Sequence, residues 1–159
     1  MAQIITVQKP DDTQNGKTEI IKNSTFFPDI NLSDVREVMR LDGTVTHARL
    51  TSAVVEAMTF VNQSLKRLKD EQQACNIASM NEMAGEVING ENIFITRYKR
   101  AVYCYSVANI QERYASFDLT REGEKKGEIF QDSINDLRRD GQLAIRDLLG
   151  VPRITAALI

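Results

Sequence analysis

Apolar residues recur with helical spacing through most of the chain, whereas both ends are irregular. From Leu50 onward, apolar positions follow at offsets of four, three, four and seven residues, which is the spacing of one helix face. With the residues that widen it, this apolar face consists of Leu50, Ala53, Val54, Ala57, Met58, Val61, Leu65 and Leu68. The pattern predicts a long helix that Thr46 caps and that runs to about Ala74.

A shorter helix is predicted immediately before the long one. Ser33 is a good N-cap residue, and Leu32 precedes it. The apolar residues expected on its inner side are Val35, Val38, Met39 and Leu41. We expect Asp42, Gly43 and Thr44 to form the tight turn between the two helices, with Gly43 at positive φ and Asp42 as an ordinary turn acid.

Two further helices follow a connection that spans residues 76–90. The third helix starts near Asn92, and its expected inner side comprises Phe94, Ile95, Tyr98, Ala101, Val102, Tyr105 and Ala108. The fourth helix starts around Thr120, and its inner positions alternate at three and four residues: Gly127, Phe130, Ile134, Leu137, Gly141, Ala144 and Leu148. Glycine inside a helix costs roughly 1 kcal/mol relative to alanine. We therefore expect these glycines to allow close approach of the third helix, at its small residues Ala101, Ala108 and Ala115.

The two ends of the chain lack this helical pattern. Residues 1–24 alternate short β-favouring runs with a turn-rich stretch, which predicts an extended N-terminal arm. Gly150 occupies a helix C′ position and Pro152 prevents continuation, so the helical body is expected to span residues 25–150. Residues 151–159 then form an extended apolar tail. The predicted fold is all-α: a small helical bundle of one short and three long helices, with an extended arm and an extended tail.

Composition and charge narrow the functional classes. With 159 residues, 42% of them hydrophobic and 26% charged, the chain is typical of one soluble domain. Its 20 basic and 22 acidic residues give a net charge of -2, which disfavours strong nucleic-acid binding. Cys75 and Cys104 form no CxxC motif or disulfide framework. Since the sequence also lacks a signal-peptide pattern and a membrane-spanning apolar run, we expect a cytosolic protein and no membrane partner.

Motifs that would carry catalysis are incomplete. His47 is the only histidine, so HExxH zinc sites and histidine-based triads are excluded. Gly16-Lys17-Thr18 matches the end of a phosphate-binding loop, but Asp11 stands where that loop requires its first glycine. We therefore expect no catalytic residue, no metal ligand and no cofactor.

An acidic pattern runs along the fourth helix. Its members recur every four residues and are here named the acidic stripe: Glu124, Glu128, Asp132, Asp136 and Asp140. At 100° per residue they drift over about 160° of the face opposite the glycines. The plain interpretation is a solvated helix face, and the functional one is a channel lining or a docking face.

Several blocks of the sequence resemble the phage head completion (GPL) family. The block from Phe26 through Phe27-Pro28-Asp29 to Ile30 is similar to the family signature. So is the block 34–46, whose motif residues are Arg36, Arg40, Leu41, Asp42, Gly43 and Thr44. Similar later blocks are 97–102, 112–114, 136–140 and 150–155. The resemblance covers nearly the whole chain from about residue 19, and residues 1–18 match least.

The resemblance implies a structural virion protein at the head–tail junction, without catalytic residues. Such a protein joins after DNA packaging, docks on the portal vertex, retains the genome and provides the tail attachment joint. The implied partners are the portal protein, further copies of the chain in a ring of twelve, and tail terminator or neck proteins. Packaged DNA is expected to pass nearby without specific binding.

The apolar tail is the predicted docking segment on the portal or on an adjacent subunit. Its residues are Val151, Pro152, Arg153, Ile154, Thr155, Leu158 and Ile159. The alternative is a tail folded back on its own helices. The competing function is a helical DNA-packaging or regulatory protein such as a small terminase subunit, which should carry a basic recognition helix or a helix-turn-helix motif.

Overall fold

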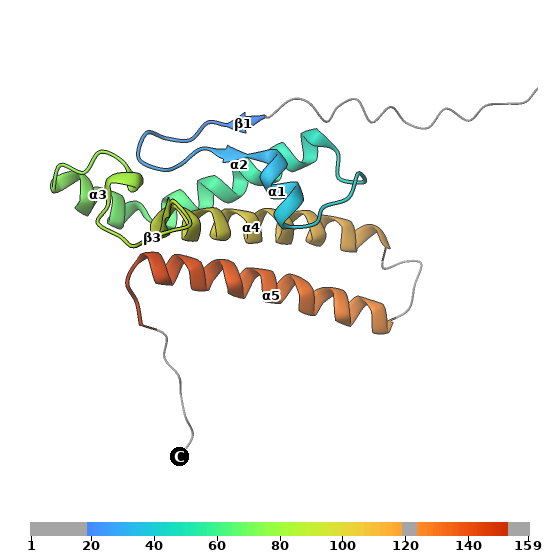
Figure 1. The fold of residues 1–159 in the computed structure, drawn as a ribbon. Helices are drawn as coiled ribbons and strands as arrows, with labels where there is room; N and C mark the ends of the chain where they lie inside the picture. The colour runs from blue at the N-terminus through green and yellow to red at the C-terminus, as the bar shows by residue number, and fades with distance from the viewer. Residues whose placement is uncertain (1–18, 119–123, 153–159) are drawn as a thin grey trace, which may run out of the picture.

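Three long helices lying side by side form the body of the protein. The computed structural model describes residues 19–118 and 124–152 (Figure 1). The helices are α2 (His47–Ser64), α4 (Ile93–Asp118) and α5 (Glu124–Leu148), with α4 packed against α2 on one side and against α5 on the other. The expectation of a helical fold is therefore confirmed, with two small sheets in addition.

The N-terminal part of the described chain forms a small antiparallel ladder followed by a short helix. Strand β1 (Ile20–Ile21) pairs with β2 (Ile30–Asn31), and α1 (Leu32–Val38) follows directly. The predicted N-cap Ser33 is wrong, because the Asn31 side chain accepts the backbone N–H of Ser33 at 2.9 Å and starts the helix two residues earlier. Residues 1–18 of the predicted arm lie outside the described chain.

After α1 the chain reverses at a left-handed residue that the sequence did not indicate. Arg40 has φ 52, and the N–H groups of Arg40 and Leu41 close the helix onto the carbonyls of Glu37 and Arg36. Val38, the last residue of the helix, is 63% exposed, although it was expected on the inner side. Val35 is buried, and Met39 and Leu41 are partly buried against the core.

The turn between α1 and α2 is confirmed, but its conformation is not the one expected. Gly43 does not have positive φ, because Arg40 has already reversed the chain. Asp42 accepts the backbone N–H of Thr44 at 3.0 Å, as a turn acid does. The Thr44 hydroxyl also bonds the Asp42 carboxylate and lowers its pKa. Thr46 caps α2 by accepting the N–H of Arg49 at 3.4 Å.

The predicted long helix is divided in two. Helix α2 ends at Ser64, and α3 (Lys66–Ala74) begins after the single non-helical residue Leu65. Every residue of the predicted apolar face is nevertheless buried, from Leu50 to Leu68. The break therefore changes the helix direction without exposing the face, and the end at Ala74 is as predicted.

The connection before α4 has structure of its own. It contains the 3-10 helix η1 (Met80–Glu82) and a hairpin of β3 (Val87–Ile88) and β4 (Glu91–Asn92). Asn89 and Gly90 have φ of 52 and 77, as a type I′ hairpin turn requires. The expectation of a plain connection over residues 76–90 is therefore corrected, whereas the predicted start of the third helix is within one residue.

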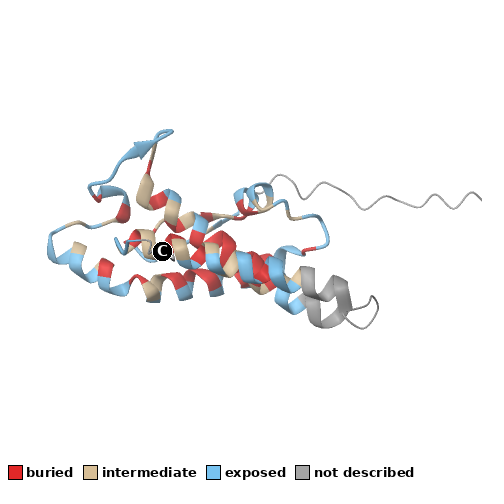
Figure 2. Ribbon diagram, turned by 90° about the horizontal axis from the view of Figure 1, so that it is seen from below, coloured by how far each residue is buried: buried red, intermediate tan, exposed pale blue. Residues whose placement is uncertain are grey.

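Helix α4 is buried on more sides than its predicted inner face. The expected inner residues are buried except Phe94, which is partly buried. Tyr103, Cys104, Ser106 and Val107 are buried as well, and Tyr103 lies near Asp34 of α1. Figure 2 shows these buried positions concentrated where the helices meet. Within the described residues, no helix combines the length and apolar character that a membrane span requires.

Gly141 on α5 confirms the expected close approach, but with a different partner. A Cβ at Gly141 would lie 2.8 Å from the Tyr105 ring and 3.4 Å from the Cys104 Cβ. The expected alanine column is therefore not the counterpart, because a tyrosine ring occupies the space over Gly141. The side chain of Ala115, and Gly123 and Gly127, lie outside what the structure describes, as does the predicted helix start at Thr120.

Candidate functional site

The two aromatic residues of the family motif lie in the hydrophobic core. Phe26 and Phe27 are buried, with their rings edge to face at 5.1 Å between centroids. Phe27 stacks on the Tyr98 ring of α4 at 5.3 Å, and the Phe26 carbonyl accepts the N–H of Met80 at 2.8 Å. These contacts join the N-terminal segment to α4 and to η1, so the two phenylalanines serve the fold.

A closed cycle of side-chain hydrogen bonds holds the same segment on the helices. The Asn23 side-chain amide donates to the Tyr98 hydroxyl at 2.8 Å. That hydroxyl donates to the side-chain carbonyl of Asn62 at 2.6 Å. The Asn62 side-chain amide donates back to the side-chain carbonyl of Asn23 at 2.8 Å. Burial raises the pKa of Tyr98, which keeps its hydroxyl protonated as the cycle requires.

Pro28 and Asp29 fix the loop between β1 and β2. The Asn23 amide also donates to the Pro28 carbonyl at 2.8 Å. The Asp29 carboxylate accepts from the Lys22 ammonium at 2.8 Å and from the Asn23 backbone N–H at 2.9 Å. The hydrogen bond from Lys22, followed by that from Asn23, lowers the pKa of Asp29. The structure thus gives both residues a loop-forming role.

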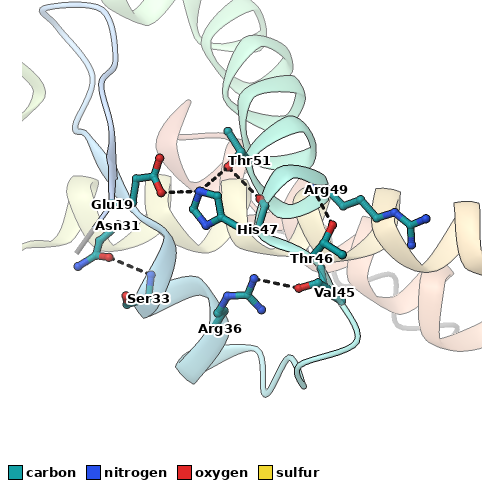
Figure 3. Close-up of polar contacts among 9 residues, drawn as sticks. All are labelled: Glu19, Asn31, Ser33, Arg36, Val45, Thr46, His47, Arg49 and Thr51. Atoms are coloured by element: carbon teal, nitrogen blue, oxygen red, sulfur yellow. Dashed lines mark hydrogen bonds and ion pairs between the residues drawn. The ribbon is translucent and has the colours of Figure 1, made fainter. Parts of the chain in front are cut away.

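Polar contacts also fasten the N-terminal segment to the start of α2 (Figure 3). The His47 ring pairs with the Glu19 carboxylate and lies 3.4 Å from the Thr51 hydroxyl. The Arg36 guanidinium donates to the Val45 carbonyl at 2.9 Å across the turn. Among the described residues, no group of three or more histidine, cysteine and acidic side chains is placed to hold a metal ion. The contacts of His47 thus join Glu19 of the N-terminal segment to the start of α2.

The acidic stripe lies on the outer side of α5 as far as it is described. Asp132 and Asp136 are exposed, and Asp136 pairs with Arg139 at 3.0 Å. Asp140 is partly buried and lies 3.4 Å from Arg100 of α4. The side chains of Glu124 and Glu128 lie outside the described structure. Within the described residues, Asp132 and Asp136 of the stripe thus face solvent. Asp140 is paired with Arg100 of the neighbouring helix.

The C-terminal end of α5 directs the chain out of the body. Gly150 has φ 68, and the N–H groups of Gly150 and Val151 close onto the carbonyls of Asp147 and Arg146, which confirms the expected C′ glycine. Arg146 also donates to the Pro152 carbonyl at 3.3 Å. Val151 is 41% exposed, and the rest of the tail, residues 153–159, lies outside the described chain.

Two further surfaces were missed by sequence reasoning. The β3–β4 hairpin presents Val87 and Ile88 to solvent at 65% and 52% exposure. A hollow of about 510 Å³, here named the α2–α4 groove, lies between the start of α2 and the later half of α4. Its lining is Ala48, Arg49, Ser52, Ala53, Asn109, Ile110 and Arg113. The Asn-Gly pair was an available hairpin signal, whereas the groove depends on how two helices pack.

Comparisons with known proteins agree with the motif blocks. Residues 21–159 match the protein family described as "Phage head completion protein (GPL)". The chain is 35% identical over 144 residues to the "Head completion/stabilization protein" of Escherichia phage P2, covering 91% of this chain and 85% of the relative. It is 25% identical over 101 residues to the "Probable head completion/stabilization protein" of Haemophilus phage HP1 (strain HP1c1), covering 60% of this chain and 67% of the relative. No solved structure matches it.

Proposed function

Because this chain belongs to the phage head completion protein (GPL) family, which is structural and not enzymatic, we propose that it docks on the portal vertex of a packaged phage head. There it retains the genome and provides the joint to which the tail attaches. Its partners are the portal protein, further copies of itself in a ring of twelve, and tail terminator or neck proteins. It is assembled in the host cytoplasm and resides at the head–tail junction of the virion.

The observation that carries this proposal is the C-terminal end of α5. The left-handed Gly150 and the following Pro152 end the helix and lead the chain away from the body, as Figure 1 shows up to Pro152. The sequence that follows is apolar, and burying Ile154, Leu158 and Ile159 on a partner contributes roughly 1.5 to 3 kcal/mol each before ordering costs. Arg153 adds a charge-assisted hydrogen bond. These properties support docking of the tail on the portal or on an adjacent subunit.

Deletion of residues 152–159 tests this role of the tail. We expect the truncated protein to remain soluble and helical but to be missing from portal-containing heads, which then lose DNA and fail to join tails. A variant with serine and glycine in place of these residues is the matched control for chain length and should fail in the same way. Normal incorporation of the truncated protein would refute docking through the tail.

The acidic stripe is proposed to face either the DNA channel or a basic surface of a neighbouring subunit. Repulsion between like charges would let DNA slide past the stripe, and a basic neighbour would be attracted to it. Reversing Asp132 and Asp136 to lysine should impair genome retention or assembly while the monomer stays folded. The matched control reverses Glu37 and Asp70, which are exposed on α1 and α3. Phage titres that equal the control would leave the stripe a solvated face.

The strength of binding to duplex DNA distinguishes the proposed role from that of a DNA-packaging or regulatory protein. The net charge of -2 and the local pairing of basic residues with acids support weak binding to duplex DNA. Submicromolar, salt-sensitive binding to random duplex DNA would instead favour a DNA-packaging regulator such as a small terminase subunit.

A further inference from the structure

We propose that copies of this chain join head to tail, with the β3–β4 hairpin of one copy seated in the α2–α4 groove of the next. This inference rests on the proposed function, because it assigns the contact between neighbours in the ring. Neither surface contains a residue of the blocks 26–30 and 34–46, and Arg113 of the groove lies in the similar block 112–114.

The hairpin is a rigid apolar projection. Val87 and Ile88 have no cover within the described chain, and β3 stands out from the helices as a pale-blue arrow in Figure 2. Its base is firmly held: the Ile93 N–H donates to the Glu86 carbonyl at 2.9 Å, and the Asn92 amide donates to the Met83 carbonyl at 2.9 Å. An element that is already ordered loses little conformational freedom on binding.

The groove offers a surface of matching character. Ala48, Ser52 and Ala53 are small, and they leave a hollow on the face of α2 that turns toward Ile110 of α4. Most of the groove surface is apolar, so aliphatic side chains from outside displace water from it favourably.

Charge at the two surfaces is also complementary. Glu86 is exposed at the base of the hairpin. Arg49 and Arg113 line the groove, and Glu56 holds Arg113 in place with both carboxylate oxygens 3.1 Å from one guanidinium nitrogen. An acidic residue beside Val87 thus meets two guanidinium groups, one of them already paired with Glu56, and this orients the contact.

The hairpin lies at the start of α4, whereas the elements that line the groove, the start of α2 and the later half of α4, lie at the other end of the bundle (Figure 1). The hairpin directly precedes α4, and the groove residue Ile110 lies about 27 Å farther along that helix at 1.5 Å per residue. A rigid hairpin does not reach its own groove, so the occupant is a second copy. Such a contact uses two different surfaces, and it closes into a ring when the rotation between copies closes.

Mixing two disabled variants of the full chain tests the contact. Val87→Asp with Ile88→Asp disables the hairpin, and Ala48→Glu with Ser52→Glu fills the groove with negative charge. In sedimentation velocity, the wild type should associate increasingly with concentration, and each variant should show about a tenfold or greater rise in the apparent dissociation constant. Together the two variants should form a pair and nothing larger, since one intact hairpin and one intact groove remain. Circular dichroism verifies that each variant is folded.

Val38→Asp is the matched control, because Val38 is as exposed as Val87 but belongs to α1 and is neither a residue of β3 nor part of the groove lining. It should behave as the wild type. A wild type that stays monomeric at all concentrations, or a mixture that forms no pair, overturns the inference. A filled groove that abolishes portal binding but leaves self-association intact also overturns it, because the groove then holds another partner.

Cross-linking in assembled particles separates this inference from the proposed function. Ile88→Cys and Ser52→Cys, in a Cys75→Ser background, should give disulfide-linked multimers on mild oxidation, and Val38→Cys with Ser52→Cys should not. Particles that contain the protein but give no cross-link overturn the inference and leave the proposed function standing. If the particles lack the protein, the proposed function fails, and the mixing experiment alone decides the inference.

Discussion

Adding one methyl group at Gly141 tests the packing of α4 on α5. In an exposed helix position, glycine to alanine stabilises by about 1 kcal/mol. At Gly141 the new Cβ would lie 2.8 and 2.9 Å from two carbons of the Tyr105 ring. That ring cannot easily retreat, because Phe60 packs on it at 4.7 Å between centroids. Overpacking of this kind costs about 1 to 3 kcal/mol, so Gly141→Ala should destabilise by up to about 2 kcal/mol.

The measurement is urea unfolding of the full chain, followed by circular dichroism, in a double-mutant cycle with Tyr105→Ala. Removing the ring removes the obstacle, so Gly141→Ala should stabilise the Tyr105→Ala protein by about 1 kcal/mol. The sign of the effect thus reverses between backgrounds, with a coupling free energy of about 1 to 3 kcal/mol.

An exposed site on the same helix measures the difference in helix propensity between glycine and alanine without any packing effect. Ser133 is exposed on α5, and the difference between Ser133→Gly and Ser133→Ala should be about 1 kcal/mol in both backgrounds. If Gly141→Ala stabilises the wild type by this same amount, the ring does not constrain Gly141 and the reasoning is refuted.

Four other substitutions have defined expectations. Tyr98→Phe breaks the hydrogen-bond cycle and leaves the part-buried Asn62 carbonyl short of a donor, so urea unfolding should show a loss of about 1 to 3 kcal/mol. Gly150→Ala places a Cβ in open space but at φ 68, and should destabilise by about 1 kcal/mol, whereas Gly43→Ala, with open space and no positive φ, should not destabilise. Asp29→Asn should reduce stability at neutral pH and flatten its acid dependence below about pH 4, because a lowered folded pKa contributes stability that is lost as pH falls through it.

Much of the helical body could be predicted because its signals are local. The apolar face from Leu50 to Leu68 follows helix periodicity, and burial along that whole face confirms it. Thr46 and Gly150 mark a helix start and a helix end through their own side-chain and backbone chemistry. Signals of this kind depend only on residues a few positions away.

The remaining features depend on contacts between distant parts of the chain. Asn23, Asn62 and Tyr98 form one cycle from three separate elements, and no short pattern connects them. Gly141 indicated a close approach but did not identify Tyr105 as the neighbour. Arg40 adopts a left-handed conformation without a residue type that favours it, so the position of the chain reversal could not be located.

The family motif describes how the monomer folds more than what it binds. Phe26 and Phe27 are buried, and Asp29 and Asp42 hold loops through hydrogen bonds. Arg36 likewise bridges the turn after α1. Surfaces that select partners must be exposed in the monomer, and these motif side chains are already engaged within the chain. The exposed hairpin, the α2–α4 groove and the C-terminal tail therefore carry the proposed specificity for neighbours. Relatives that keep the motif can share this fold while their docking surfaces differ, because substitutions there leave the core contacts unchanged.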